Sequence, residues 1–157
     1  MSTDAKVDPL PPSASVTPTP TATAPILPKK ATAGPLRGDI YWVNIPRKHT
    51  VGHEQYKRRP WLIVSNNALT PLDVVIGVPL SFQVHKKNRQ FRIAIPATEI
   101  IHEAASSHPL DPGERIALTE QVRMLSVERL EMPRSGRITD TALFAVEAGV
   151  AFVLDIQ

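Results

Sequence analysis

The amino-acid sequence predicts a mainly β (α+β) protein: a small barrel with an antiparallel sheet and a C-terminal helix, preceded by a disordered Pro-rich tail. Three observations support this fold class. Short β-branched runs bounded by proline or asparagine recur between residues 39 and 95. Apolar residues at helical spacing occur near the C-terminus, after residue 139. The first 36 residues hold 8 Pro, 9 Ser/Thr and 6 Ala and no aromatic residue. Short strands followed by one packed helix are typical of small β-barrels.

The composition of the chain changes near residue 36 and divides it into two parts. A segment rich in Pro, Ser, Thr and Ala offers little apolar surface to offset the entropy of ordering. We therefore expect residues 1–36 to form a disordered spacer and residues 37–157 to form one domain.

Three strands are predicted in the first half of the domain. The segment 39–45 stops at Pro46, the run 61–65 ends at two asparagines, and the run 74–78 stops at Pro79. The runs 61–65 and 74–78 are nearly continuous and β-branched, which suits strands that are buried on both faces.

The second half of the domain contains two further predicted strands and the helix. The segment 90–95 alternates polar and apolar residues, as a half-exposed strand does, and it ends at Pro96. A long, mobile connection over 97–114 leads to a fifth strand, 116–125, after a Pro-Gly turn. Thr139 or Asp140 caps the helix, and its apolar stripe consists of Leu143, Val146, Val150 and Val153.

Charge is divided unevenly within the domain, although the whole chain of 157 residues carries only +3. Residues 37–92 have ten Lys/Arg and three Asp/Glu, whereas residues 93–157 have five and ten. The basic residues gather in two loops, around Lys57-Arg58-Arg59 and around Lys86-Lys87. This clustering is typical of phosphate binding, and solubilising loop charge is the alternative explanation.

Several classes of chemistry are excluded or disfavoured by composition. The chain has no cysteine, so disulfides, Cys-ligated zinc, iron–sulfur clusters and thiol nucleophiles are excluded. His49 and His53 are four residues apart, but Pro46 and Gly52 argue against a helix that would align them as metal ligands. We predict no metal and no cofactor. No apolar run reaches the roughly 18 residues of a membrane span, and no signal architecture is visible, so the expected location is cytoplasmic without membrane contact.

Four motifs resemble those of a known family. Residues 37–43 read R-G-D-I-Y-W-V, and residues 52–55 read G-H-E-Q, with R-P-W-L-I-V-S-N following at 59–66. Residues 78–83 read V-P-L-S-F-Q and residues 117–123 read A-L-T-E-Q-V-R. In order and spacing these motifs resemble the PemK/Kid–MazF family of endoribonuclease toxins from type II toxin–antitoxin systems.

The resemblance implies an SH3-like barrel and a metal-independent endoribonuclease that cleaves single-stranded RNA, including mRNA. Attack by a ribose 2′-OH would leave a 2′,3′-cyclic phosphate and a 5′-hydroxyl. The family also implies a homodimer that is inhibited by a cognate antitoxin. Two alternatives remain at this point: a non-catalytic toxin of the same barrel that binds a protein such as gyrase, and a degenerate interaction module whose working part is the Pro-rich tail.

The resemblance places four candidate catalytic residues. Arg59 suits charge stabilisation on a phosphorane because a guanidinium stays protonated and directs two donors at a phosphate. Ser81 can donate one hydrogen bond to a phosphate oxygen. Glu54 and His53, together with Glu120, are candidates for the proton transfers, and base and acid stay unassigned.

The remaining candidates are expected to bind substrate. Tyr56, in the basic loop, is the best placed aromatic residue for stacking on a base, because Trp61 and the other aromatic residues of apolar runs are expected in the core. Leu118 stands where the Kid-like branch has an arginine, so a mechanism that uses that arginine does not carry over. The predicted substrate-binding residues are Gln55, Tyr56, Lys57, Gln83, Lys86, Lys87, Glu120, Gln121 and Arg123.

Overall fold

The computed structural model describes residues 34–83 and 89–156. The predicted disordered tail up to residue 33, and the predicted substrate contacts Lys86 and Lys87, lie outside the described residues. The described domain already packs at Pro35, just before the predicted boundary. Pro35 is buried, and its carbonyl accepts a hydrogen bond of 3.0 Å from the Thr70 hydroxyl.

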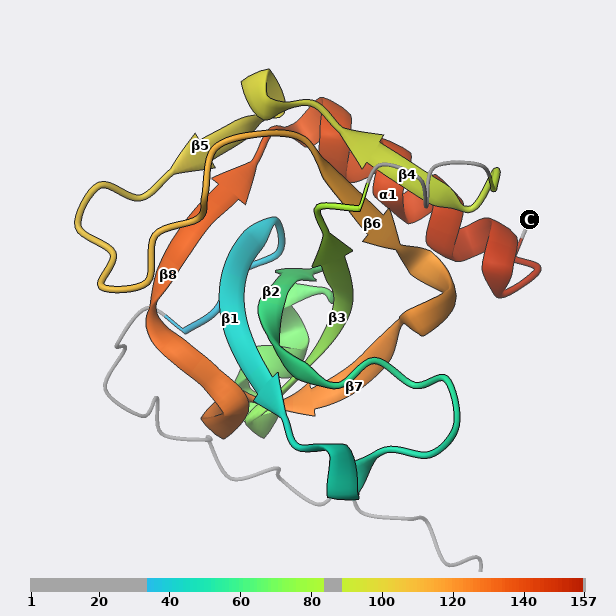
Figure 1. Cartoon of the computed structure of the whole chain (residues 1–157), viewed down its shortest axis with the longest axis horizontal. Coiled ribbons are helices and arrows are strands. Elements are labelled where there is room, and N and C mark those ends of the chain that lie inside the picture. Colours follow the sequence, from blue (N-terminus) through green and yellow to red (C-terminus); the bar gives the residue numbers. More distant parts are fainter. Residues whose placement is uncertain (1–33, 84–88, 157) are drawn as a thin grey trace, which may run out of the picture. The chain divides into compact units, whose positions relative to one another are not determined.

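The described part of the chain forms one antiparallel sheet and a C-terminal helix, which confirms the predicted fold class (Figure 1). Its strands are β1 (Asp39–Ile45), β2 (Lys57–Ile63), β3 (Val74–Ser81), β4 (Arg92–Ile95), β5 (Ile100–His102), β6 (Arg115–Leu118), β7 (Arg123–Ser126) and β8 (Leu130–Ile138). The helix is α1 (Asp140–Val153), and short 3-10 turns are η1 (Arg47–His49), η2 (Asn67–Leu72), η4 (Ala97–Glu99), η5 (Thr119–Gln121) and η6 (Val127–Arg129).

The strands lie in the order β4-β6-β3-β2-β1-β8-β5, with β7 pairing separately with β3. Every pairing among the described strands is antiparallel. The sheet is strongly curled, and α1 packs against β4 and η5 at one side (Figure 1).

Both faces of the central strands are buried, as their continuous apolar runs predicted. Even-numbered residues of β1 and β2, such as Ile40 and Leu62, pack into a core with Leu143 and Val146 of α1. Odd-numbered residues such as Val43 and Trp61 pack into a second core with Leu125 and Leu130, among others. This alternation decides which side chains of β2 face the candidate site and which face away from it.

Two strands were missed by the sequence analysis. β5 lies inside the predicted mobile connection 97–114, and β8 lies between the predicted fifth strand and the helix. β8 contains Pro133, Arg134 and Gly136, which interrupt the apolar alternation, and its register with β1 shifts between Ile40 and Trp42. Gly136 is required by close approach of β5, because a Cβ there would lie 2.6 Å from the Ile101 carbonyl oxygen.

The predicted fifth strand, 116–125, is two strands separated by η5. The end of β3 pairs with β6 and its beginning pairs with β7, so residues 119–121 leave the sheet between them. The buried Thr119 hydroxyl holds this turn, because it donates to the Phe91 carbonyl and lies 3.3 Å from the Gly149 carbonyl. Figure 1 shows the turn between β6 and β7 beside α1.

The C-terminal helix begins where the sequence predicted. Thr139 is its N-cap, and the Thr139 hydroxyl accepts a hydrogen bond of 3.3 Å from the Ala142 N–H. Leu143 and Val146 of the predicted stripe are buried. Gly149 allows close contact with the sheet, since a Cβ there would lie 2.9 Å from Ile93 Cγ1 and 3.1 Å from Thr119 Cγ2.

Candidate functional site

Arg59 and Ser81 lie at the ends of two neighbouring strands. Trp61 of β2 is paired with Pro79 of β3, and Ile63 with Gly77. Arg59 and Ser81 each lie two residues beyond the Trp61–Pro79 pair, toward the same end of the two strands. Because side chains alternate along a strand, both residues share the face that carries Trp61.

A cavity of about 220 Å³ lies beside Trp61 of β2, and neither Arg59 nor Ser81 is among the residues that line it. It is bounded by the loop before β2, by β2 itself, by η5 and by the start of β7. The structure thus brings together five residues that were predicted from separate motifs: Glu54, Gln55, Glu120, Gln121 and Arg123. The Gln55 N–H donates to Gln121 Oε1 over 3.3 Å, which connects the loop to the turn. Trp61 and Val122 complete the lining.

Only part of the Arg59 guanidinium is hydrogen-bonded within the described residues. Its Nη2 donates to the Tyr56 carbonyl over 3.1 Å, and its Nε is buried without a hydrogen-bond partner in the described chain. Burial lowers the pKa of the Arg59 guanidinium, but an arginine remains protonated at neutral pH. Lys57 has a φ of 71°, in the left-handed region that is unusual for a residue other than glycine, as the chain enters β2.

Two cations lie near the Tyr56 ring. The Arg47 guanidinium is 5.3 Å and the Lys57 ammonium 5.4 Å from the centre of its ring. The ring is half-buried, and the Lys57 side chain is exposed. The ring therefore sits in a positively charged setting near the site.

The Ser81 hydroxyl oxygen accepts a hydrogen bond from the backbone. The Gln83 N–H donates to Ser81 Oγ over 3.2 Å, and Gln83 itself is exposed. No acceptor for the Ser81 hydroxyl proton is found in residues 34–83 and 89–156.

The loop that carries His53 and Glu54 is exposed. Gly52 has a φ of 59°, and the Glu54 carboxylate accepts a hydrogen bond of 3.2 Å from the Val51 N–H. Glu54 reaches the cavity, whereas His53 is not among the residues that line it. Glu54 is therefore the better placed of the two for a role there.

Glu120 is fixed by an arginine that the sequence analysis did not select. Arg92 of β4 donates from Nε to Glu120 Oε1 over 2.7 Å, and its Nη2 lies 2.5 Å from the same oxygen. The other oxygen, Oε2, is buried and has no hydrogen-bond partner in the described chain. Arg92 is an ordinary polar position of an alternating strand, so no motif distinguishes it before the fold is known.

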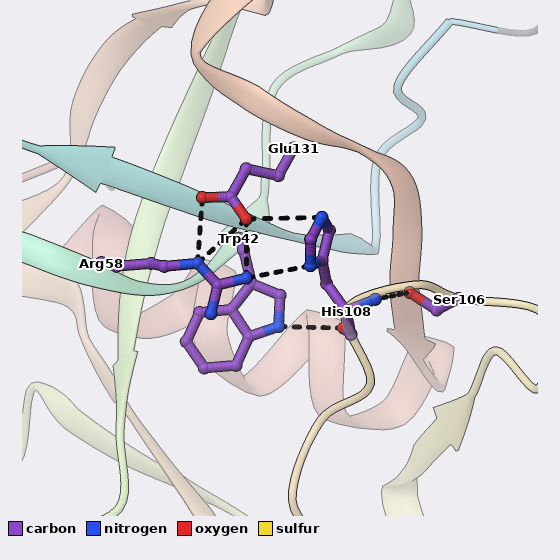
Figure 2. A network of polar contacts seen from close by, with 5 residues as sticks. All are labelled: Trp42, Arg58, Ser106, His108 and Glu131. Carbon is purple, nitrogen blue, oxygen red and sulfur yellow. Dashed lines mark hydrogen bonds and ion pairs between the residues drawn. The ribbon is translucent and has the colours of Figure 1, made fainter.

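The Arg58 side chain lies on the face of β2 opposite to Arg59, and its hydrogen-bond partners are different (Figure 2). Its Nε lies 3.0 Å from both carboxylate oxygens of Glu131, and its Nη2 donates to Glu131 Oε2 over 2.7 Å. The same Nη2 donates to His108 Nδ1 over 3.1 Å. The guanidinium also lies 4.4 Å from the centre of the Trp42 ring, and this hydrogen-bonded arginine lowers the pKa of Glu131. The basic cluster seen in the sequence is therefore divided between two faces.

A larger cavity, of about 410 Å³, lies away from these residues. Its two charged residues, Arg37 and Glu147, are hydrogen-bonded to each other, with Arg37 Nε donating to Glu147 Oε1 over 2.6 Å. None of the predicted site residues lines it. The smaller cavity, which five of the predicted site residues line, is therefore the candidate site.

No group of three or more His, Asp or Glu side chains in residues 34–83 and 89–156 is arranged to hold a metal ion. Within the same residues, no helix has the length and apolar character needed to cross a membrane.

The curled antiparallel sheet and the C-terminal helix are those of the MazF-like fold. Residues 36–154 match the family of PemK-like, MazF-like toxins of type II toxin–antitoxin systems. The chain belongs to this family.

Several solved structures share this fold. MazF from Deinococcus radiodurans is 22% identical, with a TM-score of 0.59 over 78% of this chain and 97% of that chain. An endoribonuclease from a mycobacterial species in complex with its cognate antitoxin is 23% identical, with a TM-score of 0.55 over 79% of this chain and 98% of the other. A MazE–MazF complex from D. radiodurans is 19% identical, with a TM-score of 0.55 over 79% and 98% of the two chains. At such identities the similarity shows the shared fold. No curated protein matches the chain.

Proposed function

We propose that this chain is an endoribonuclease toxin that cleaves single-stranded RNA without a metal ion. A ribose 2′-OH attacks the adjacent phosphorus, and the products are a 2′,3′-cyclic phosphate and a 5′-hydroxyl. Membership of the toxin family supports this proposal. The observation that carries it is the cavity that Glu54 and Glu120 line together with Gln55, Gln121 and Arg123. Arg59 precedes Trp61 of this cavity by two residues, on the same face of β2.

Arg59 has the properties needed for charge stabilisation in this reaction. Negative charge develops on the phosphorane oxygens as the 2′-OH attacks. A partly desolvated guanidinium interacts with that charge more strongly than an exposed one, because water screens it less. The Arg59 guanidinium is half-buried and keeps donors beyond the one that bonds the Tyr56 carbonyl, and these can take a phosphate oxygen.

Ser81 and the carboxylates supply the remaining roles. The Ser81 hydroxyl proton donates to a non-bridging phosphate oxygen, which positions the phosphorus for in-line attack. Glu54 at the cavity edge is the proposed partner for proton transfer with the 2′-OH or the leaving oxygen, with the nearby His53 as the alternative. Gln55, Gln121, Arg123 and Gln83 would contact the RNA strand, and Tyr56 would stack on a base.

The proposed protein partner is an antitoxin, as in the MazE–MazF complex and in the complex of the mycobacterial endoribonuclease. The net +7 segment 37–92 suits an acidic, initially disordered antitoxin tail that would cover the Arg59 region and block RNA. Binding by such a tail should weaken as salt rises. By analogy with the family, the active form would be a homodimer in the cytoplasm.

The experiment is to incubate the purified protein with a long RNA in EDTA and to sequence the RNA ends. We expect cleavage at a short preferred sequence, with 2′,3′-cyclic phosphate and 5′-hydroxyl termini. Protein with Arg59→Ala, purified in parallel, controls for contaminating nucleases. Absence of cleavage by the wild-type protein, or cleavage only when magnesium is added, would contradict the proposal.

A further inference from the structure

Phe82 is an exposed aromatic residue at the end of β3, and the sequence analysis did not select it as a site residue. It follows Ser81, the last residue of the strand, and it is 42% exposed. A single exposed apolar side chain is ordinary on a protein surface. Phe82 differs from such a residue because one face of its ring is covered by a buried cation, Arg115 of β6.

The Arg115 guanidinium lies against the face of the Phe82 ring. Its central carbon is 3.4 Å from the ring centre, which is van der Waals contact, since carbon atoms pack at roughly 3.5 to 4.0 Å. A guanidinium at the edge of the ring would lie further from the centre. Because Arg115 is fully buried, at 0% exposure, the exposed surface of Phe82 belongs to the opposite face and the rim of the ring.

Arg115 is itself fixed by the backbone. Its Nη1 donates to the Gly113 carbonyl over 3.3 Å, and its Nη2 donates to the Asp111 carbonyl. Burial lowers the pKa of Arg115 to about 10, against a smaller opposing effect of the Asp111 carboxylate, so the guanidinium is protonated at neutral pH. Gly113 also lies beside the ring, since a Cβ there would be 3.9 Å from Phe82 Cε1. The ring therefore rests on a support that is held by hydrogen bonds.

The exposed ring lies at the strand end that carries the proposed catalytic residues. Phe82 directly follows β3 and Tyr56 directly precedes β2, and because the two strands are antiparallel these positions belong to the same end. Ser81, the proposed phosphate contact, is the chain neighbour of Phe82, so their Cα atoms are about 3.8 Å apart. An aromatic residue therefore lies next to the proposed phosphate contacts on each of the two strands.

We propose that Phe82 is a stacking platform for one nucleobase of the RNA, with Arg115 as the positioning residue beneath the ring. The inference rests on the proposed RNA-cleaving function and names a base-binding position for it. Proteins that bind single strands combine cations along the backbone with aromatic rings on which bases stack. Because every base has a flat π face, the platform accepts any base and contributes affinity more than sequence choice.

Charge favours RNA over an apolar segment of a protein as the occupant. Within residues 34–83 and 89–156, none of Arg47, Lys57 and Arg59 forms an ion pair, whereas Arg58 on the other face of β2 is paired with a carboxylate. Cations without carboxylate partners, at the strand end that also carries the exposed ring, suit a polyanion with flat bases.

The test measures binding of a random-sequence pool of 2′-O-methyl decamers, which have no free 2′-OH and are not cleaved. Phe82→Leu keeps an apolar cover over Arg115 and removes the flat ring, and we expect it to weaken binding at least about fivefold. Phe82→Tyr keeps a flat ring and should bind as the wild type does. Phe152→Leu is the matched control, because Phe152 is 54% exposed on α1 and belongs to no proposed site. It should bind normally, and thermal unfolding establishes that each variant is folded.

Salt dependence separates stacking from charge. Loss of a base stack removes no phosphate contact, so the slope of log Kd against log salt should be the same for Phe82→Leu and the wild type. Lys57→Gln, which removes a proposed phosphate contact, should reduce that slope by about 0.7. A reduced slope in Phe82→Leu would show that the substitution acts on the charged surface, and the stacking platform would be wrong.

A fluorine NMR spectrum gives a readout without substitution of Phe82. The chain has 4 phenylalanines, and all are replaced by 4-fluorophenylalanine during expression. We expect the Phe82 signal to move when the decamer pool is added, while the Phe152 signal stays in place. This measurement decides the inference by itself if Phe82→Leu does not fold.

The outcomes separate this inference from the proposed nuclease function. If RNA is cleaved and the decamers bind, but neither Phe82→Leu nor the fluorine signal shows an effect, the platform is wrong and the nuclease function stands. If the decamers move the Phe82 signal and RNA is not cleaved, the nuclease function fails and the platform stands as an RNA-binding position. If the decamers do not bind, or if only an acidic peptide containing tryptophan moves the signal, the inference is overturned.

Discussion

Replacing Arg59 with alanine tests the proposed chemistry most directly. The guanidinium is half-buried, and its Nε is unpartnered next to the strand end that carries Ser81. Loss of one transition-state donor of this kind costs about 2.7 to 4 kcal/mol, or about 10²- to 10³-fold in rate. We therefore expect Arg59→Ala to lower the single-turnover rate of RNA cleavage by at least about a hundredfold, measured in EDTA on an oligonucleotide that contains the preferred sequence.

The same substitution should affect stability only slightly. Alanine removes one hydrogen bond, from Nη2 to the Tyr56 carbonyl, which is worth about 1 kcal/mol. It also removes a partly desolvated charge, whose burial is unfavourable. The two effects oppose each other, so we expect a change in the unfolding midpoint of no more than about 4 °C.

Arg58→Ala is the matched control for Arg59→Ala. It removes the same side chain one position earlier, on the opposite face of β2, where Arg58 is paired with Glu131 at the surface. Its side chain is 43% exposed, so the pair contributes about 0 to 1 kcal/mol. We expect near wild-type cleavage. Equal loss of activity in both variants would show that general positive charge, and not the position of Arg59, drives the reaction. Wild-type activity in Arg59→Ala would refute its catalytic role.

Three further predictions follow from the same structure. Ser81→Thr should retain cleavage because it keeps the hydroxyl, and Ser81→Ala should be slow; the opposite order of the measured rates would remove the hydroxyl from the mechanism. Gly149→Ala should destabilise the domain by about 1 to 2 kcal/mol in chemical denaturation, because overpacking against Ile93 and Thr119 outweighs the gain of about 1 kcal/mol in helix propensity; a more stable variant would show that α1 is free to move away from η5. Deletion of residues 1–33, which have little apolar surface to bury, should leave the unfolding midpoint and the cleavage pattern unchanged, and a midpoint lowered by many degrees would show that the tail packs on the domain.

The sequence predicted those parts of the fold whose apolar patterns are uninterrupted. β1 was predicted with its observed bounds, and the helix with its Thr139 cap, because each combines a regular pattern with a clear end residue. β8 was missed because its nine residues include proline, glycine and two arginines, and its place in the sheet depends on β1 and β5 at either side. Pairing of this kind is tertiary information that no local pattern contains.

The candidate site likewise contains residues that the sequence predicted and residues that only the fold reveals. Motif resemblance selected Arg59, Glu54 and Gln121, because the family pattern records them. It could not select Arg92, whose role comes only from the antiparallel pairing of β4 with β6 that places it beside Glu120. It also could not separate Arg58 from Arg59, because the two differ in the face of β2 that each occupies.

The sequence predicted one continuous strand over 116–125, and the structure interrupts it. This segment contributes several of the residues that line the candidate site. An unbroken strand over 116–125 would keep the backbone of residues 119–121 in the ladder with β3. Instead η5 leaves the sheet, and this allows Gln121 to accept from the Gln55 N–H and Glu120 to accept from Arg92. The turn is held by a buried hydroxyl and by a glycine of α1, so its geometry depends on a helix that lies some thirty residues further along the chain. The local pattern and the observed structure disagree here because a turn replaces regular strand pairing and positions polar groups around the cavity. Such disagreements are expected at functional sites.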